Sequence, residues 1–525
     1  MSTQYSHSDI ADNTPVIIAG GQYSEQVPKG ATAPFSPPAQ LASEAARSAL
    51  AACGVGDIAA EIDTIAFIRL FSDSAPLWRS EFGGSNNLPE SLARRIGANP
   101  NHRIYSTAGG TEPLTLLNEI ALAISRGEKS LALLAGAEAI AYQRHARRKQ
   151  LLDDWQEEYD TELDNRPYDK RFAAPEELRS GMTMPSHYYS LIENFQAHKR
   201  GLNGEQQRQF MAQLMAPFST VAAANPNAFF PRAYSTEQLS TINNDNYALT
   251  IPYTKTLVAQ DAVNQGAALV VCSAAKARLL GVPAQNWIFL HGFAQGSDNP
   301  LLQRPDPGQS ETLVNVIEHT LSMAKTGIED IDLLDIYSCF PCAVTAVCDA
   351  LNIPADGSRP LTVTGGLPFF GGPGNNYAMH ALAEMAMKLR GNKQRGLITA
   401  NGGQLSKHAA VVLSDLPELT DHSVLEWPVA NRLEVPQKDN AIRSICAAPS
   451  TGTIISYTVI YHRDEPDLGL VMAETADGQR FLADSSDPQT TKTMITQSPI
   501  GRSIITTSCD QRHQFSFNDH QAARQ

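Results

Sequence analysis

The residues best suited to chemistry lie in and around a glycine-rich stretch at 361–379, Leu-Thr-Val-Thr-Gly-Gly-Leu-Pro-Phe-Phe-Gly-Gly-Pro-Gly-Asn-Asn-Tyr-Ala-Met. Its glycines and prolines separate a β-rich start from a helical pattern at 375–390, which predicts a tight turn into the N-terminus of a helix. Backbone amides at such a turn can hold a carbonyl oxygen or an anion. We therefore predict that Gly371, Gly374 and Asn375 contact a ligand, with a structural helix cap as the alternative role of Asn375.

Other side chains outside this stretch could also react or bind. Cys339 and Cys342 form a Cys-x-x-Cys pattern at a predicted strand-to-helix turn, where a thiolate could be stabilised. Buried structural thiols are the alternative, because no second ligand pair or thioredoxin-like context accompanies them, and we predict no metal site. Lys407 and His408 follow a predicted turn that begins at Asn401. These three residues are candidates for contacting a ligand, with a solvated turn as the alternative.

Two further side chains lie near the stretch. Tyr337 could donate a hydrogen bond into a site, or it could simply fill volume. The apolar spacing of the helix expected at 375–390 places His380, with Glu384 one turn later, on the solvated face. We therefore predict no role in a site for His380.

These residues need a scaffold, and alternating strand and helix patterns predict a layered α/β sheet. In the first half, strands are expected at 15–20, 62–70, 103–106 and 130–135, and helices at 41–52, 91–96 and 116–124. In the second half, strands are expected at 287–293, 333–337, 396–400 and 409–413, and helices at 311–326, 341–351 and 375–390. We interpret this as one α/β unit present twice in tandem.

Two regions depart from this alternation. Residues from about 144 to 250 crowd charges and polar-faced helical patterns, which we interpret as an inserted loop domain with a solvated helix face. From residue 452 onward, short strand patterns separated by turns predict a small antiparallel barrel of the OB type. Its many acidic residues would repel phosphates, which argues against nucleic-acid binding by this barrel.

The composition bounds the class of protein. The chain has 525 residues, of which 42% are hydrophobic and 18% are charged, as in ordinary soluble proteins. A formal net charge of -14 argues against nucleic acid or an anionic membrane as a partner. We find no apolar run that could span a bilayer and no leader pattern, so we expect a cytoplasmic protein. The 7 scattered cysteines predict reduced thiols.

Four stretches together resemble the thiolase superfamily. They are 264–271 (Asn-Gln-Gly-Ala-Ala-Leu-Val-Val), 337–340 (Tyr-Ser-Cys-Phe), 365–376, and 399–403 (Thr-Ala-Asn-Gly-Gly). The resemblance is nearest to the sterol-carrier-protein-type branch and to thiolase-like proteins with an added C-terminal domain. It implies a duplicated five-layer αβαβα body plus a small all-β OB-like domain. It also implies an N-terminal half at 1–285 that contains the loop domain, a C-terminal half at 286–425, and the added domain at 430–525.

The resemblance also implies where the catalytic residues of the family would lie. The nucleophilic cysteine, the activating histidine, the second cysteine and the asparagine or histidine of the family fall on Gly110, Gly372, Ala400 and Tyr337, respectively. No cysteine lies between Cys53 and Cys272, so no shift of the alignment restores the nucleophile. We therefore expect a degenerate active site without covalent thiolase chemistry, in which the two glycines enlarge the pocket.

The resemblance implies two alternative functions. The first is binding of an acyl-CoA or related thioester, with no tightly bound cofactor, by an acyltransferase-like protein of lipid metabolism whose reaction would be acyl transfer or carbon-carbon bond formation or cleavage. Tyr337, Cys339, Lys407 and His408 are its candidate residues. The second is a non-catalytic scaffold for an enzyme that uses acyl-CoA or an acyl carrier, with the C-terminal domain as a contact for a partner protein. A homodimer across the sheet edge of the first half is also implied, but no membrane or nucleic-acid partner.

Overall fold

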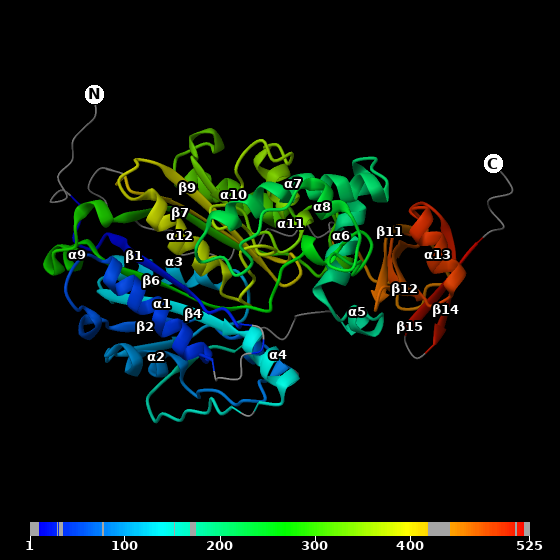
Figure 1. Cartoon of the computed structure of the whole chain (residues 1–525). Helices are drawn as coiled ribbons and strands as arrows, with labels where there is room; N and C mark the ends of the chain where they lie inside the picture. The colour runs from blue at the N-terminus through cyan, green and yellow to red at the C-terminus, as the bar shows by residue number, and fades with distance from the viewer. Residues whose placement is uncertain are drawn as a thin grey trace.

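The computed structural model describes residues 10–28, 30, 35–75, 78–151, 153–167, 175–417, 442–509 and 512–518. They form a large α/β body and, at one end of it, a small barrel from the C-terminal part of the chain (Figure 1). The predicted domain boundaries at 425 and 430 fall within 418–441, outside the described residues. In the ranges given above, no helix has the length and apolar character to cross a membrane.

Strands and helices alternate in both halves of the body. The first half contains β1 (Pro15–Ser24), α1 (Pro38–Ala52), β2 (Thr64–Phe67), α2 (Leu88–Ile96), β3 (His102–Tyr105), α3 (Glu112–Ser125), β4 (Leu131–Ala139) and β6 (Asn264–Ser273). The second half contains β7 (Ile288–Ser297), α10 (Glu311–Met323), β8 (Leu333–Asp335), α11 (Pro341–Leu351), α12 (Tyr377–Leu389), β9 (Arg395–Gly402) and β10 (Lys407–Ser414). The strand orders are β3-β2-β4-β6-β1 and β7-β10-β9-β8. The second therefore mirrors the first.

The two halves stack in layers. Helices α1 and α2 pack on the outer face of the first half, α10 packs on the outer face of the second, and α3 and α12 contact strands of both. The halves also join at the edge through two residue pairs between β1 and β7. Gly20 on β1 permits the close packing of α12, because a Cβ there would lie 2.6 Å from Cα of Ala383. The predicted duplicated αβαβα body is confirmed.

One predicted strand start is wrong. Residues 361–363 do not form a strand, because the amides of Val363 and Thr364 each donate to Oδ2 of Asp335 at 3.0 Å. The hydroxyls of Thr362 and Thr364 donate to the same carboxylate at 2.9 Å. Asp335, at the end of β8, therefore accepts hydrogen bonds that a neighbouring strand would otherwise accept, and it fixes the start of the glycine-rich stretch.

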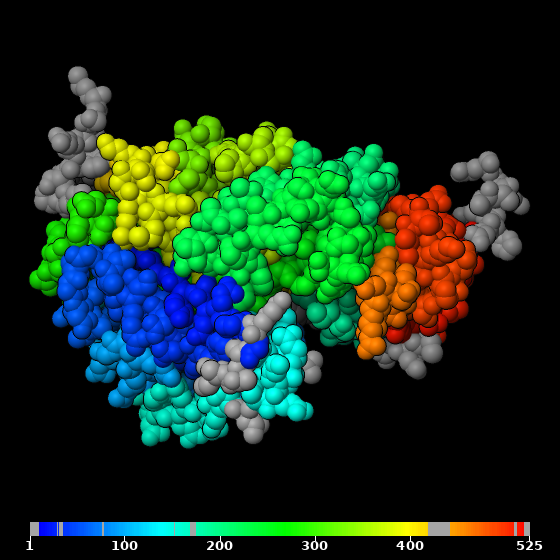
Figure 2. All heavy atoms as spheres, viewed as in Figure 1, coloured from blue at the N-terminus to red at the C-terminus, as the bar shows by residue number. Residues whose placement is uncertain are grey.

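The chain between β4 and β6 spreads over both halves. It contains α4 (Ile140–Lys149), β5 (Asp164–Asn165), α5 (Pro175–Arg179), α6 (Pro185–Lys199), α7 (Gly204–Ala224) and α8 (Thr236–Ser240). Helices α6 and α7 contact α11 of the second half, whereas β5 joins the sheet of the first half. In Figure 2 the green atoms of this connection cover a broad part of the visible face above the first half.

The outer edge of the first half is covered by the chain itself. Strand β5 pairs in parallel with β3, the edge strand. The buried guanidinium of Arg69 donates to Oδ1 of Asn165 at 2.5 Å and to the carbonyl of Arg166 at 2.6 Å. Arg166 in turn forms two bonds, 2.7 and 2.6 Å long, with the carboxylate of Glu119. Some backbone groups of β3 that could pair with another chain are thus already paired with β5 of the same chain.

The C-terminal part is a closed five-stranded barrel. Its elements are β11 (Thr451–His462), β12 (Glu465–Glu474), β13 (Arg480–Ser485), α13 (Pro488–Thr496), β14 (Ser503–Cys509) and β15 (Arg512–Phe517). The strand order is β11-β12-β13-β15-β14; the other pairs are antiparallel, as the sequence predicts, and the pair β13–β15 is parallel. A small all-β domain is confirmed, and its assignment to the OB type stays a prediction.

Candidate functional site

The glycine loop before α12 is shaped by the side chains around it. Gly371 and Gly374 have φ values of +120° and +52°, which favour glycine. A Cβ on Gly374 would also overlap the carboxylate of Glu138. The amides of Gly372 and Gly374 donate to the carbonyls of Gln260 and Gly372, both at 2.8 Å. The protein itself therefore satisfies the amide of Gly374, one of the residues that we predicted as ligand contacts.

Asn375 connects the glycine loop to the first half and does not cap α12. Its Nδ2 donates to the carbonyl of Arg69 at 2.9 Å and to Oγ of Ser74 at 3.0 Å. Its Oδ1 accepts from the amide of Gly109 at 3.1 Å. Asn376 occupies the N-cap position but makes no side-chain cap bond. The predicted asparagine cap is wrong, because these side chains face the other half of the body.

The position where the resemblance places a nucleophile is filled. A Cβ built on Gly110, just before α3, would overlap the carbonyl oxygen of Asn401 and lie 2.5 Å from Oη of Tyr337. The expectation that glycine enlarges the pocket here is wrong, because an aromatic ring and a backbone carbonyl occupy the space. The structure thus brings Gly110, Tyr337 and Asn401 together at the N-terminus of α3.

The other two positions implied by the resemblance, Gly372 and Ala400, have different surroundings. A Cβ on Gly372 would have its nearest neighbours 3.5 Å away, at the Gln260 carbonyl and the Leu367 side chain, so this position has room for a side-chain carbon. Ala400 is buried in β9, opposite Ala409 of β10.

Cys339 and Cys342 lie beneath this site as neutral thiols. Burial raises the pKa of Cys339 to about 11 and raises that of Cys342 well above its usual value. Sγ of Cys339 lies 3.6 Å from Oδ1 of Asn401, and the hydroxyl of Tyr253 donates to Sγ of Cys342 at 3.2 Å. This environment favours the structural interpretation of the Cys-x-x-Cys pattern. All six cysteines whose side chains are described are free thiols.

Lys407 and His408 are neighbours in strand β10. The alternative that they lie in a solvated turn is therefore wrong. His408 is 1% exposed and lies under α10, where its Nε2 is 3.1 Å from Oγ of Ser310 and 3.4 Å from Oδ2 of Asp298. Strand alternation places Lys407 on the opposite face, toward α3. Only Lys407 therefore faces the site.

Glu112 was not predicted as a site residue. It lies in the first turn of α3, two residues after Gly110, and is 8% exposed. Burial raises the pKa of its carboxyl, while a hydrogen bond with Thr107 and the charge of Lys407 oppose that shift. A carboxylate two residues after the Gly-Gly pair was the available signal, because helix N-termini attract acidic groups.

His380 is fully buried, which contradicts the prediction of a solvated face. Helix α12 lies between the two halves, so most of its surface is enclosed. Nδ1 of His380 lies 2.8 Å from Oε1 of Gln22 on β1. Burial lowers the pKa of His380 to about 3.

This burial predicts a pH dependence of stability. The pKa of His380 in the folded protein, about 3, is below the unfolded value of about 6.5, so the unfolded chain binds a proton first as the pH falls. The full contribution to stability is present above pH 6.5 and is lost below it. Between pH 7 and pH 5 the loss is about 2 kcal/mol. We expect the free energy of unfolding of His380→Gln, measured with urea, to decrease less over this pH range than that of the unaltered protein, by that amount. Equal decreases in both proteins would contradict the effect of burial on His380.

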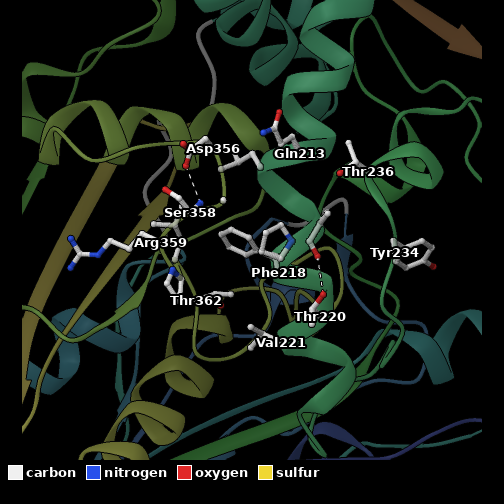
Figure 3. Close-up of a pocket in the computed structure, with 16 residues that line it drawn as sticks. Gln213, Phe218, Thr220, Val221, Tyr234, Thr236, Asp356, Ser358, Arg359 and Thr362 are labelled. Carbon is white, nitrogen blue, oxygen red and sulfur yellow. Dashed lines mark hydrogen bonds between the residues drawn. The ribbon is translucent and has the colours of Figure 1, made fainter.

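A pocket of about 560 Å³ lies between α7 and the loop at 356–362, which leads into the glycine-rich stretch (Figure 3). Leu214, Phe218 and Leu361 form a buried apolar floor. Gln213 also lines the pocket, and its carbonyl lacks the usual helix hydrogen bond, because Pro217 has no amide hydrogen to donate. Phe218 separates the pocket from the glycine turn, since a Cβ on Gly366 would lie 2.7 Å from its ring. The volume is in the range of small-molecule sites.

Comparison with known proteins identifies the family. The chain matches a crystal structure of a monomeric SCP2-thiolase like protein type 1 from Mycobacterium smegmatis with a TM-score of 0.81 and 34% identity, over 97% of this chain and 99% of that chain. The protein belongs to the SCP2-thiolase-like proteins of type 1. Residues 434–511 match the model of the thiolase-like protein type 1 additional C-terminal domain.

Two other comparisons are more distant. This thiolase-like protein resembles an Ltp2-ChsH2(DUF35) aldolase with a TM-score of 0.57 and 17% identity, over 77% of this chain and 98% of that chain, which supports the fold alone. An acetyl-CoA acetyltransferase of Methanothermobacter thermautotrophicus is 26% identical over 231 residues, or 41% of this chain. The match spans 57% of the length of that curated relative.

Proposed function

We propose that this thiolase-like protein binds an acyl-CoA or a related thioester reversibly and forms no acyl-cysteine. The observation that carries the proposal is the filled position at Gly110, where Tyr337 and Asn401 leave no space for a nucleophilic side chain. The raised pKa values of Cys339 and Cys342 support it, because a buried thiol is a weak nucleophile. The similarity to an acetyl-CoA acetyltransferase supports the choice of ligand class.

The site offers a place for a polar head and a place for an apolar tail. The N-terminus of α3, with Lys407 beside Glu112, is suited to a thioester carbonyl or a carboxylate. The pocket over Phe218 is suited to an apolar group, because its floor is apolar. In this arrangement Tyr337 supplies a hydroxyl at the position that the resemblance assigns to catalysis.

The test is incubation with acetyl-CoA and with a long-chain acyl-CoA, followed by calorimetry and intact-mass measurement. We expect reversible binding and an unchanged protein mass. Ala216→Trp, which fills the pocket beside α7, should weaken the binding of the long-chain acyl-CoA more than the binding of acetyl-CoA. Gln209→Trp on an exposed part of the same helix is the matched control. A mass increase by one acyl group would contradict the proposal, and binding to an acyl-carrier or partner protein alone would favour the scaffold.

We also expect the protein to be a monomer, in contrast to the homodimer that the resemblance implies. Strand β5 and its Arg69 and Arg166 contacts occupy the edge of β3 that a second subunit would pair with. A row of backbone groups that is already paired offers little to a partner strand. Sedimentation velocity at micromolar concentration should give the mass of one chain. A mass of two chains would show that another surface forms the interface.

A further inference from the structure

The C-terminal barrel is fixed to the body by a seam of hydrogen bonds. Strand β11 lies against α6, where Nδ2 of Asn194 donates to the carbonyl of Tyr457 at 2.7 Å. Oγ of Ser456 donates to the carbonyl of Leu191 at 2.5 Å. Figure 1 shows β11 and β12 next to α6 at this end of the body. This seam holds the barrel in place, and its helix α6 also carries Tyr189, whose hydroxyl contacts Asn401 and Leu405.

A second contact runs from the barrel toward the site. Arg480 on β13 is 2% exposed, and its guanidinium donates to the carbonyls of Arg304 and Pro305, the latter at 2.9 Å. Nε of Arg480 donates to the carboxylate of Glu474 at 2.9 Å, within the barrel. A carboxylate of the barrel thus orients a cation that binds the main chain of the body.

The next residue in this path is Arg304 itself. It is 3% exposed, and its guanidinium donates to the carbonyl of Gln404 at 3.1 Å and to that of Asn299 at 3.0 Å. Arg480 therefore fixes the backbone of a residue whose own side chain binds the turn after β9. Charge-assisted bonds of this kind are stronger than neutral ones.

The turn that Arg304 holds is strained. Gln404 and Leu405 have φ values of +54° and +59°, and each such residue costs on the order of 1 kcal/mol. The amide of Leu405 donates to the hydroxyl of Tyr189 at 3.1 Å, and that hydroxyl donates to Oδ1 of Asn401 at 3.2 Å. Asn401 lies near the end of β9, just before the turn, and places its carbonyl where a Cβ on Gly110 would lie. A strained turn persists only while its surroundings hold it.

We propose that Arg480 is a positioning residue, through which the C-terminal barrel holds the turn at 401–405 in place beside Gly110. The bonds run from Arg480 to Arg304 and from Arg304 to Gln404. The added domain then helps to hold the candidate site in its conformation. That the turn touches a bound thioester rests on the proposed function.

The experiment compares full-length Arg480→Met with the unaltered protein by hydrogen exchange and by calorimetry with acetyl-CoA. We expect amide exchange in the peptide covering 401–406 to be about fivefold faster and acetyl-CoA affinity to fall about fivefold. Arg480→Lys keeps one donor and should restore part of both values. Arg512→Met is the matched control, since Arg512 binds Asp484 inside the barrel at 2.6 Å. It should leave both values unchanged.

The outcomes separate positioning from general loosening. Faster exchange confined to 401–406, with the amides of β11 unchanged, supports the proposal. Unchanged exchange at 401–406, or an equal increase along the seam between β11 and α6, would overturn it. Absence of acetyl-CoA binding by the unaltered protein would contradict the proposed function alone, because the exchange measurement uses no ligand.

Discussion

Replacing Gly110 by alanine is expected to lower the free energy of unfolding by about 3 kcal/mol. The new Cβ would overlap the carbonyl oxygen of Asn401 and lie 2.5 Å from Oη of Tyr337. The tyrosine could rotate, but the carbonyl belongs to the end of β9, which is paired with β10 from Arg395 to Gly402. Relief therefore requires a shift of the backbone. Urea denaturation of the full chain measures the effect.

A second glycine of the site provides the control. Gly372 has 3.5 Å to its nearest neighbours and its φ is not positive, so Gly372→Ala should change stability by less than about 0.5 kcal/mol. Gly110→Cys should be destabilised like Gly110→Ala and should gain no acyl adduct by intact-mass measurement. If Gly110→Cys were as stable as the unaltered protein and became acylated, the site would be a thiolase site that lacks only its nucleophile.

Replacing Asp335 by alanine is expected to cost about 4 kcal/mol or more. This carboxylate is 0% exposed and accepts from the amides of Val363 and Thr364 and from the hydroxyls of Thr362 and Thr364. The hydroxyl of Tyr377 also donates to its Oδ1 at 3.2 Å. Removing the acceptor leaves buried donors without partners at the start of the glycine stretch. The midpoint of unfolding should shift to a clearly lower urea concentration.

Asp356 gives a matched comparison, because its carboxylate is exposed and bonds only locally, accepting from the amide of Ser358 at 2.9 Å. Asp356→Ala should stay within about 0.5 kcal/mol of the unaltered protein. Equal losses for the two variants would show that the bonds to Asp335 contribute little. Because Tyr377 packs edge-on against Tyr337 with 5.3 Å between ring centres, Asp335→Ala should also weaken ligand binding at the site.

The sequence predicted the architecture because its signals are local. Continuous apolar runs such as β6, which is buried along its whole length, indicate central strands, and the order of elements repeats in the two halves. The glycine-rich stretch predicted a turn into α12 for the same reason. The two-residue strand β5 left no such pattern, so the covered sheet edge was not predictable.

The placement of the site residues was less predictable. His380 has a polar residue one turn later, which suggested a solvated face, but a helix that lies between two sheets is enclosed on nearly every side. Lys407 and His408 are adjacent in sequence, yet β10 directs them to opposite faces. Only the fold decided which of them faces α3.

The sequence by itself determined the duplicated α/β unit, the separate barrel and the lack of a cysteine at the position that the resemblance implies, because each depends on residues close together in the chain or on residue identity alone. Only the tertiary structure decided that the position at Gly110 is filled. Tyr337 and Asn401 lie far from it in the chain, and long-range packing of this kind leaves no periodic pattern in a sequence.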